Sequence, residues 1–149
     1  MESKDPGRLS DLYFKTIHHE FTHILNQTKN YSEDFQLISG ADYVLSAWNT
    51  TRPNSYLQAG FISNYSQHSA GEDFAEMLST YIITTPEQWS EWMTTAGTAG
   101  ASKISRKLEF VRNYMLTAWN VDLDKLRDTV LRRMDDVLNE RVDLEDLTI

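Results

Sequence analysis

The chain has 149 residues, of which 40% are hydrophobic and 11% aromatic, and it carries a formal net charge of −8. This composition predicts one globular domain, and the acidic charge argues against binding of nucleic acid or anionic membranes, because both would add electrostatic repulsion. The chain has no cysteine, which excludes disulfides, thiolate metal ligands and a cysteine nucleophile.

The first predicted element is a helix over residues 10–27, which contains the stretch IHHEFTHIL. At about 100° per residue, the side chains of His19 and His23 point about 40° apart, and Glu20 points about 100° from His19. Two imidazoles one helical turn apart can bind one zinc ion, so we interpret this helix as metal-binding. The alternative is the solvated face of an amphipathic helix, since the opposite face is apolar: Phe14, Ile17, Phe21, Ile24 and Leu25.

Residues 28–69 have a weak periodic signal. Short pieces at 33–38, 41–48 and 54–59 are separated by breaks that contain glycine or proline, and residues 61–64 predict one short extended segment. We therefore expect a mainly α fold with few or no strands.

A helix predicted over residues 71–83 carries Glu72 and Glu76, again four residues apart and opposite an apolar stripe. A His-Glu-x-x-His sequence followed by two acids at this spacing is the ligand pattern of a glutamate-type zincin. In that pattern His19, His23 and Glu72 bind Zn²⁺, and Glu76 orients a ligand histidine from behind.

Other interpretations of these acids stay open. Glu72 can form a capping box with Ser69, or it can be an acid favoured in the first turn by the helix dipole. Glu76 can belong to a solvated face. Asp73 and His68 are competing candidates for the third ligand, although Asp73 points about 100° away from the Glu72 face.

The C-terminal part of the chain predicts further helices. Pro86 can begin a short helix, residues 97–100 (GTAG) predict a loop, and two long helices follow over 102–119 and 122–139, while residues 140–149 predict an acidic, frayed tail. The tryptophans are expected to pack in the core rather than to line a substrate site: Trp48, Trp89, Trp92 and Trp119. Residues 1–149 are thus predicted to form a single domain.

Three stretches carry a family resemblance: TIHHEFTHILNQTKNY, GFISNYSQHSAGEDFAEMLSTYI and KLEFVRNYMLTAWNVDLDKLRD. They resemble the zinc-binding metallopeptidase lipoproteins of Bacteroidetes, which are associated with nutrient import at the outer membrane. The resemblance extends from about residue 12 to about residue 133. The site also resembles the protease domain of anthrax lethal factor, in which a tyrosine lies seven residues before the glutamate ligand, as Tyr65 does before Glu72 here.

This resemblance implies a zincin-like catalytic core and a role for each site residue. It assigns His19, His23 and Glu72 as zinc ligands, Glu20 as the catalytic acid and base, and Tyr65 as the donor to the transition state. Members of the family are considerably longer, so we expect this chain to be a C-terminal fragment. A substrate-orienting strand is not predicted before the metal-binding helix, and we therefore expect weak or no activity from the isolated chain.

Two classes of function follow from these observations. The first is a zinc-dependent hydrolase, most simply a metallopeptidase acting on a peptide or protein substrate. The alternative is a zinc-binding interaction module, or an accessory of outer-membrane nutrient import, with weak or no hydrolytic activity. The chain itself has no apolar run typical of a signal peptide or transmembrane helix and is expected to be soluble. By resemblance, the parent protein is expected to be an extracytoplasmic lipoprotein of the outer membrane.

Overall fold

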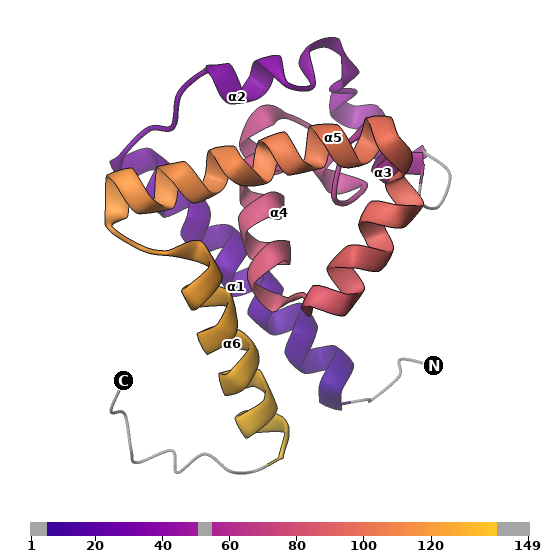
Figure 1. The fold of residues 1–149 in the computed structure, drawn as a ribbon. Coiled ribbons are helices and arrows are strands. Elements are labelled where there is room, and N and C mark those ends of the chain that lie inside the picture. The colour runs from indigo at the N-terminus through magenta and orange to yellow at the C-terminus, as the bar shows by residue number, and fades with distance from the viewer. Residues whose placement is uncertain (1–5, 51–54, 140–149) are drawn as a thin grey trace.

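The computed structural model describes residues 6–50 and 55–139. Every regular element in these two ranges is helical (Figure 1), which confirms the predicted mainly α fold. The predicted acidic tail at 140–149 lies outside the described residues. In chain order the elements are α1 (Pro6–Thr28), α2 (Asp34–Leu37), η1 (Gly40–Asp42), η2 (Leu45–Thr50), α3 (Ser55–Ala59), η3 (Tyr65–Gln67), α4 (Ala70–Ile83), α5 (Pro86–Trp119) and α6 (Leu123–Leu138).

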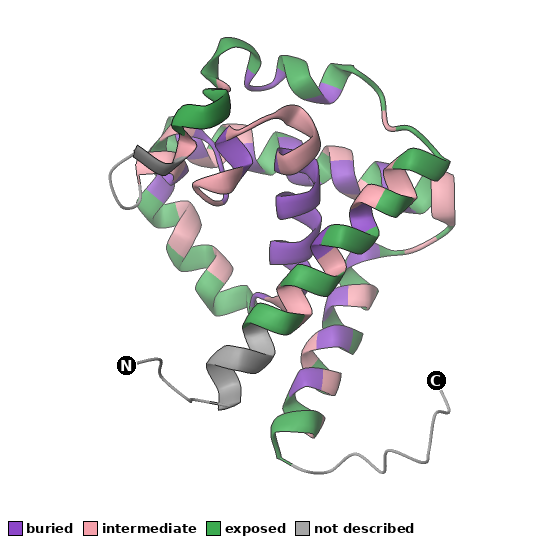
Figure 2. Cartoon of the chain, turned by 180° about the vertical axis from the view of Figure 1, so that it is seen from behind, coloured by how far each residue is buried: buried purple, intermediate pink, exposed green. Residues whose placement is uncertain are grey.

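Helix α4 is the centre of the fold. Every residue of Asp73–Ile82 is buried, and α1, α5 and α6 contact this helix from different sides (Figures 1 and 2). Its start is fixed by the Ser69 hydroxyl, which accepts a hydrogen bond from the backbone N–H of Glu72. Its end precedes Pro86, which occupies the first turn of α5, where a missing N–H costs nothing. Polar side chains on α4 are therefore placed inside the molecule.

Aromatic side chains pack around the first half of α4. The ring of Phe74 stacks on Tyr31 with centroids 4.4 Å apart, and it meets Phe35 and Tyr114 edge-on at 5.1 and 5.2 Å. Such edge and offset contacts add about 0.5–1.5 kcal/mol per pair beyond the burial of apolar area. This cluster joins α4 to the segment that follows α1 and to α5.

The break predicted at 97–100 is present as a kink at Gly97 between two helical parts of α5, and it is shorter than the expected loop because helical backbone resumes directly after Gly97. Gly97 has φ 67° and bends the helix at this point, a backbone conformation that glycine adopts without steric cost. Gly100 has a different role: a Cβ atom there would lie 2.2 Å from the carbonyl oxygen of Leu57 in α3. Gly97 therefore allows the bend in α5, and Gly100 allows the close contact between α5 and α3.

Two smaller expectations also differ from the structure. Helix α1 begins at Pro6, earlier than predicted. The extended segment expected at 61–64 forms bends that lead into η3, and Phe61 and Ile62 are buried there. The predicted helix at 71–83 corresponds closely to α4, and the one at 122–139 to α6.

The apolar face of α1 lies mostly at the surface. Ile17, Phe21 and Ile24 keep 63%, 54% and 56% of their surface exposed, whereas His19 on the opposite face keeps 8%. The polar face of α1 packs on α4 because it meets the buried acids of that helix. Among the described residues, no helix combines the length and the apolar character that crossing a membrane requires.

Candidate metal centre

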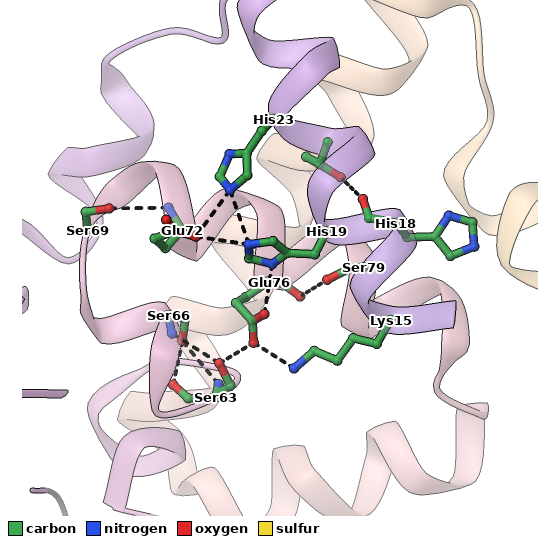
Figure 3. A network of polar contacts seen from close by, with 11 residues as sticks. Lys15, His18, His19, His23, Ser63, Ser66, Ser69, Glu72, Glu76 and Ser79 are labelled. Carbon is green, nitrogen blue, oxygen red and sulfur yellow. Dashed lines mark hydrogen bonds and ion pairs between the residues drawn. The ribbon is translucent and has the colours of Figure 1, made fainter. Parts of the chain in front are cut away.

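Helices α1 and α4 bring three potential metal ligands together (Figure 3). His19 Nε2 lies 3.0 Å from Glu72 Oε2, and His23 Nε2 lies 3.2 Å from the same oxygen. The two imidazole Nε2 atoms are 3.2 Å apart. Among the described residues, this is the cluster of histidine and acidic side chains whose geometry could hold a metal ion.

The three atoms fit a zinc ion by both chemistry and spacing. Ligand bonds of about 2.0–2.1 Å in a tetrahedral site place neighbouring ligand atoms about 3.3 Å apart, close to the separations observed here. Two imidazoles and one carboxylate form a common ligand set of catalytic zinc sites, which leave a fourth position open. The site therefore fits the ion that the sequence predicts.

Glu76 supports His19 from the other side of its ring. Its Oε1 lies 2.9 Å from His19 Nδ1, and its Oε2 lies 2.8 Å from Lys15 Nζ. The hydroxyl of Ser63 donates a second hydrogen bond to Oε2. Burial alone would raise the pKa of Glu76, but the contacts with His19, Lys15 and Ser63 outweigh it and lower the pKa to about 2. Glu76 is thus held as a buried anion behind the cluster.

The two acids also act on His19 itself. Burial lowers the pKa of this imidazole, yet Glu76 and Glu72 on either side of the ring outweigh that effect and raise it. Opposite charges near an ionisable group favour its charged form. The centre is therefore an electrostatic environment that favours a cation, whether a proton or a metal ion.

Tyr65 lies beside the cluster at the start of η3. Its ring centroid is 5.9 Å from that of His19, and it is held between Trp48, edge-on at 5.1 Å, and His68, stacked at 5.8 Å. Burial, a hydrogen bond with Glu72 and nearby acidic charge raise the pKa of the Tyr65 phenol. The phenol therefore keeps its proton at neutral pH and is able to donate it in a hydrogen bond.

Glu20 follows His19 on α1 and is exposed. Within the described part of the chain its carboxylate has no ion-pair partner, although its charge contributes to the raised pKa of Tyr65. An exposed carboxylate beside the cluster is accessible to water and to a substrate.

The competing ligand candidates have other partners. Asp73 is fully buried and pairs with Lys107 at 2.7 Å, while the Tyr43 hydroxyl donates to the same oxygen at 2.9 Å. His68 packs on Tyr65. His18 stacks on Phe14 with centroids 6.3 Å apart and does not belong to the cluster.

Sequence reasoning missed three residues around the centre. Lys15 lies one turn before His19, a spacing visible in the sequence that would have placed it on the same face. Ser63 follows α3 in irregular structure and gives no periodic signal. Trp48 was expected in the core, but its ring contacts Tyr65.

Comparisons with known proteins give a consistent result. A family model described as "Putative zinc-binding metallo-peptidase" matches residues 1–124. Among solved structures, the chain is similar to the crystal structure of "a putative zinc-binding metallo-peptidase" from Bacteroides caccae ATCC 43185, with 34% sequence identity and a TM-score of 0.87. The match covers 99% of this chain and 56% of that protein, so the chain spans little more than half of its length. No curated protein matches the chain.

Proposed function

The chain belongs to the zinc-binding metallo-peptidase family, and we propose that it is a zinc-dependent hydrolase of the HExxH…E type that cleaves peptide bonds. The observation that carries this proposal is the convergence of His19, His23 and Glu72 on one point, with three ligand atoms 3.0–3.2 Å apart. These residues would hold the zinc ion. When bound, zinc would act as a Lewis acid and would lower the pKa of a water molecule to about 7.

Glu20 is proposed as the general base and acid. Its carboxylate takes the proton of the attacking water and later delivers it to the nitrogen of the leaving amine. This role is supported by its position next to a ligand in the sequence and by its exposed carboxylate. A site that only binds zinc has no use for this group.

Tyr65 is proposed to stabilise the oxyanion that forms when the peptide carbonyl is attacked. A phenol with a raised pKa keeps its proton and donates a hydrogen bond to the developing negative charge. The contacts with Trp48 and His68 limit the positions its ring can take. Such pre-orientation reduces the reorganisation needed during the reaction.

Glu76 is proposed to position His19. A carboxylate next to Nδ1 fixes the tautomer in which Nδ1 carries the proton and Nε2 offers its lone pair. Lys15 and Ser63 hold that carboxylate in place. The ligand is thereby oriented before any ion arrives.

The proposal is tested by Glu20→Gln in the zinc-loaded protein, with peptide hydrolysis and zinc content measured on the same sample. The substitution removes a proton shuttle and no ligand, so zinc should remain while hydrolysis is lost. Glu87→Gln, which removes an exposed acid from the first turn of α5, is the control for the change in charge. Hydrolysis that survives in Glu20→Gln would contradict the mechanism. A wild-type chain that holds zinc and cleaves no peptide, both alone and within any longer protein that contains it, would favour the non-hydrolytic zinc-binding module.

The outer-membrane lipoprotein location and the nutrient-import partners rest on the family resemblance alone, and they stay predictions.

A further inference from the structure

A cavity of about 400 Å³ opens directly beside the metal centre. His23 forms part of its wall, so the cavity begins at one of the three clustered residues. The remaining wall comes from the end of α1, the segment leading to α2, α2 itself and the start of α4. Its volume lies in the range of small-ligand pockets, and it is adequate for the side chain of one substrate residue.

The lining of this cavity is polar and carries one carboxylate. Four lining side chains are carboxamides, and Glu33 adds the acid, while no lysine or arginine lines the cavity. Carboxamides both donate and accept hydrogen bonds. The carboxamides are Asn26, Gln27, Asn30 and Gln36.

Asn26 has hydrogen-bonding capacity that the protein does not use. Its Oδ1 and Nδ2 atoms are both buried, and neither has a hydrogen-bond partner among the described residues. Leaving a buried polar group unpaired costs free energy, which a polar ligand group can recover. Asn26 lies close to one turn after His23 on α1, so this capacity is next to the metal centre.

The charge of Glu33 is likewise available to a ligand. Glu33 precedes α2, makes no capping hydrogen bond and is exposed. Lys29, the nearest cationic side chain along the sequence, donates its ammonium group to the carbonyl of Ala118 and lies over the Trp119 ring. A cationic ligand group would therefore meet an acid that Lys29 does not neutralise.

We infer that this cavity is a specificity subsite that accepts the basic side chain, lysine or arginine, of a substrate residue next to the cleaved bond. The inference rests on the proposed function, because the substrate is taken to be a peptide. Glu33 pairs with the cationic end of the side chain, and the carboxamides supply acceptors around it. His23 at the wall sets the distance between this side chain and the reacting carbonyl.

The test uses peptide binding, which does not depend on turnover. Zinc-loaded Glu20→Gln protein is titrated with short peptides that carry lysine at each position in turn, and with matched peptides that carry norleucine instead. At one position lysine should bind about two- to fivefold more tightly, the range that an exposed ion pair supplies. Equal binding of lysine and norleucine at every position would overturn the inference.

Two variants made in the same background locate the preference. Glu33→Gln should abolish the preference for lysine, whereas Asp34→Asn should keep it, because Asp34 is an exposed acid of the same segment that does not line the cavity. If both variants lose the preference for lysine, the net charge of the protein causes that preference, and the inference is overturned. Zinc content measured in each variant excludes an indirect effect through the metal.

A third variant tests the cavity itself. A Cβ atom added at Gly71 meets only the Tyr31 hydroxyl within 4 Å, at 4.0 Å, so Gly71→Leu can fill the cavity from the start of α4. Binding of the lysine peptide should fall while binding of an alanine peptide at the same position stays unchanged. An equal loss for both peptides would overturn the inference.

The outcome also separates the subsite from the proposed chemistry. Peptides that bind with the Glu33-dependent preference, but that neither the zinc-loaded chain nor a longer protein containing it hydrolyses, would contradict the hydrolase and support the subsite. Hydrolysis without any preference for a basic residue would support the hydrolase and overturn the subsite.

Discussion

Glu76 Oε1 lies 2.9 Å from His19 Nδ1, while Nε2 of the same ring lies 3.0 Å from Glu72 Oε2. One imidazole is thus held between two acids of α4 that are one turn apart. The inner acid, Glu76, keeps 4% of its surface exposed and has two further partners, Lys15 and Ser63. The outer acid, Glu72, faces both histidines. This arrangement is the one expected if Glu72 is a metal ligand and Glu76 orients a ligand.

We expect Glu76→Gln to weaken zinc affinity by about 10–100-fold, the usual effect of losing a group that hydrogen-bonds to a ligand and orients it. Glu72→Gln should weaken it much more, because a ligand is lost. Competition with a chelator of known affinity measures both values. If Glu76→Gln is the more damaging change, the ligand lies one turn further along α4 than proposed.

The ligand role of His23 predicts a direct effect on metal content. His23→Ala should hold far less than one equivalent of zinc by elemental analysis, whereas the wild-type chain should hold close to one. His18→Ala is the matched control, because His18 is on the same helix but outside the cluster. Equal zinc in all three proteins would exclude the site. Chelation should also lower the melting temperature of wild type, since an ion that binds only the folded state stabilises it by mass action.

Tyr65→Phe should reduce turnover with little change in zinc content. Loss of one hydrogen-bond donor to an oxyanion costs roughly a hundred- to a thousandfold in kcat. Tyr114→Phe removes a phenol that donates to the carbonyl of Lys29 in the core, so it should affect stability and leave kcat nearly unchanged. Similar kcat values for Tyr65→Phe and wild type would remove Tyr65 from the mechanism.

The clustered residues were predictable because helix geometry is local. The spacing of His19 and His23, and of Glu72 and Glu76, fixes each pair on one face of its helix. The contact between the two helix faces depends on the tertiary structure, and the sequence indicated it only through the chemistry of a shared metal ion and the family resemblance. Lys15 has the same spacing relative to His19, but a lysine suggests no ligand role, so its contact with Glu76 appears only in the structure.

Other features depend on packing that the sequence does not encode locally. The periodicity of α1 identifies an apolar face, but Ile17 and Phe21 on that face remain exposed, since the acids of α4 draw the opposite face inward. The GTAG stretch has the composition of a loop. In the structure Gly97 bends α5, and Gly100 allows the helix to approach Leu57. A glycine needed for close contact cannot be distinguished from a loop glycine by composition.

The last prediction concerns the buried ion pair that anchors the start of α4. Lys107 and Asp73 are both fully buried and 2.7 Å apart, and Lys107 also donates to the carbonyl of Gly60. Lys107→Met should lower the free energy of unfolding by about 3–5 kcal/mol, because Asp73 is left as a buried acid without its cation. Lys103→Met is the matched control: its pair with Asp42 is exposed, and such pairs contribute about 0–1 kcal/mol.

The pH dependence of the decrease in unfolding free energy caused by Lys107→Met gives an independent check. Burial raises the pKa of Asp73 to about 6 even though Lys107 opposes the shift, so removal of Lys107 should raise it further. A carboxyl group whose folded-state pKa exceeds its unfolded value loses stability as the pH rises towards and through the folded pKa. Below about pH 6 Asp73 is protonated in both proteins, and the difference between them should be constant. Above about pH 6 wild type releases this proton while the variant keeps it, so the deficit of Lys107→Met should grow with pH.

Urea unfolding at about pH 5 and about pH 7.5, with a chelator present, measures this change. A deficit that is the same at both pH values would show that the cost comes from lost packing and the unpaired Gly60 carbonyl, which do not titrate, and not from the charge of Asp73.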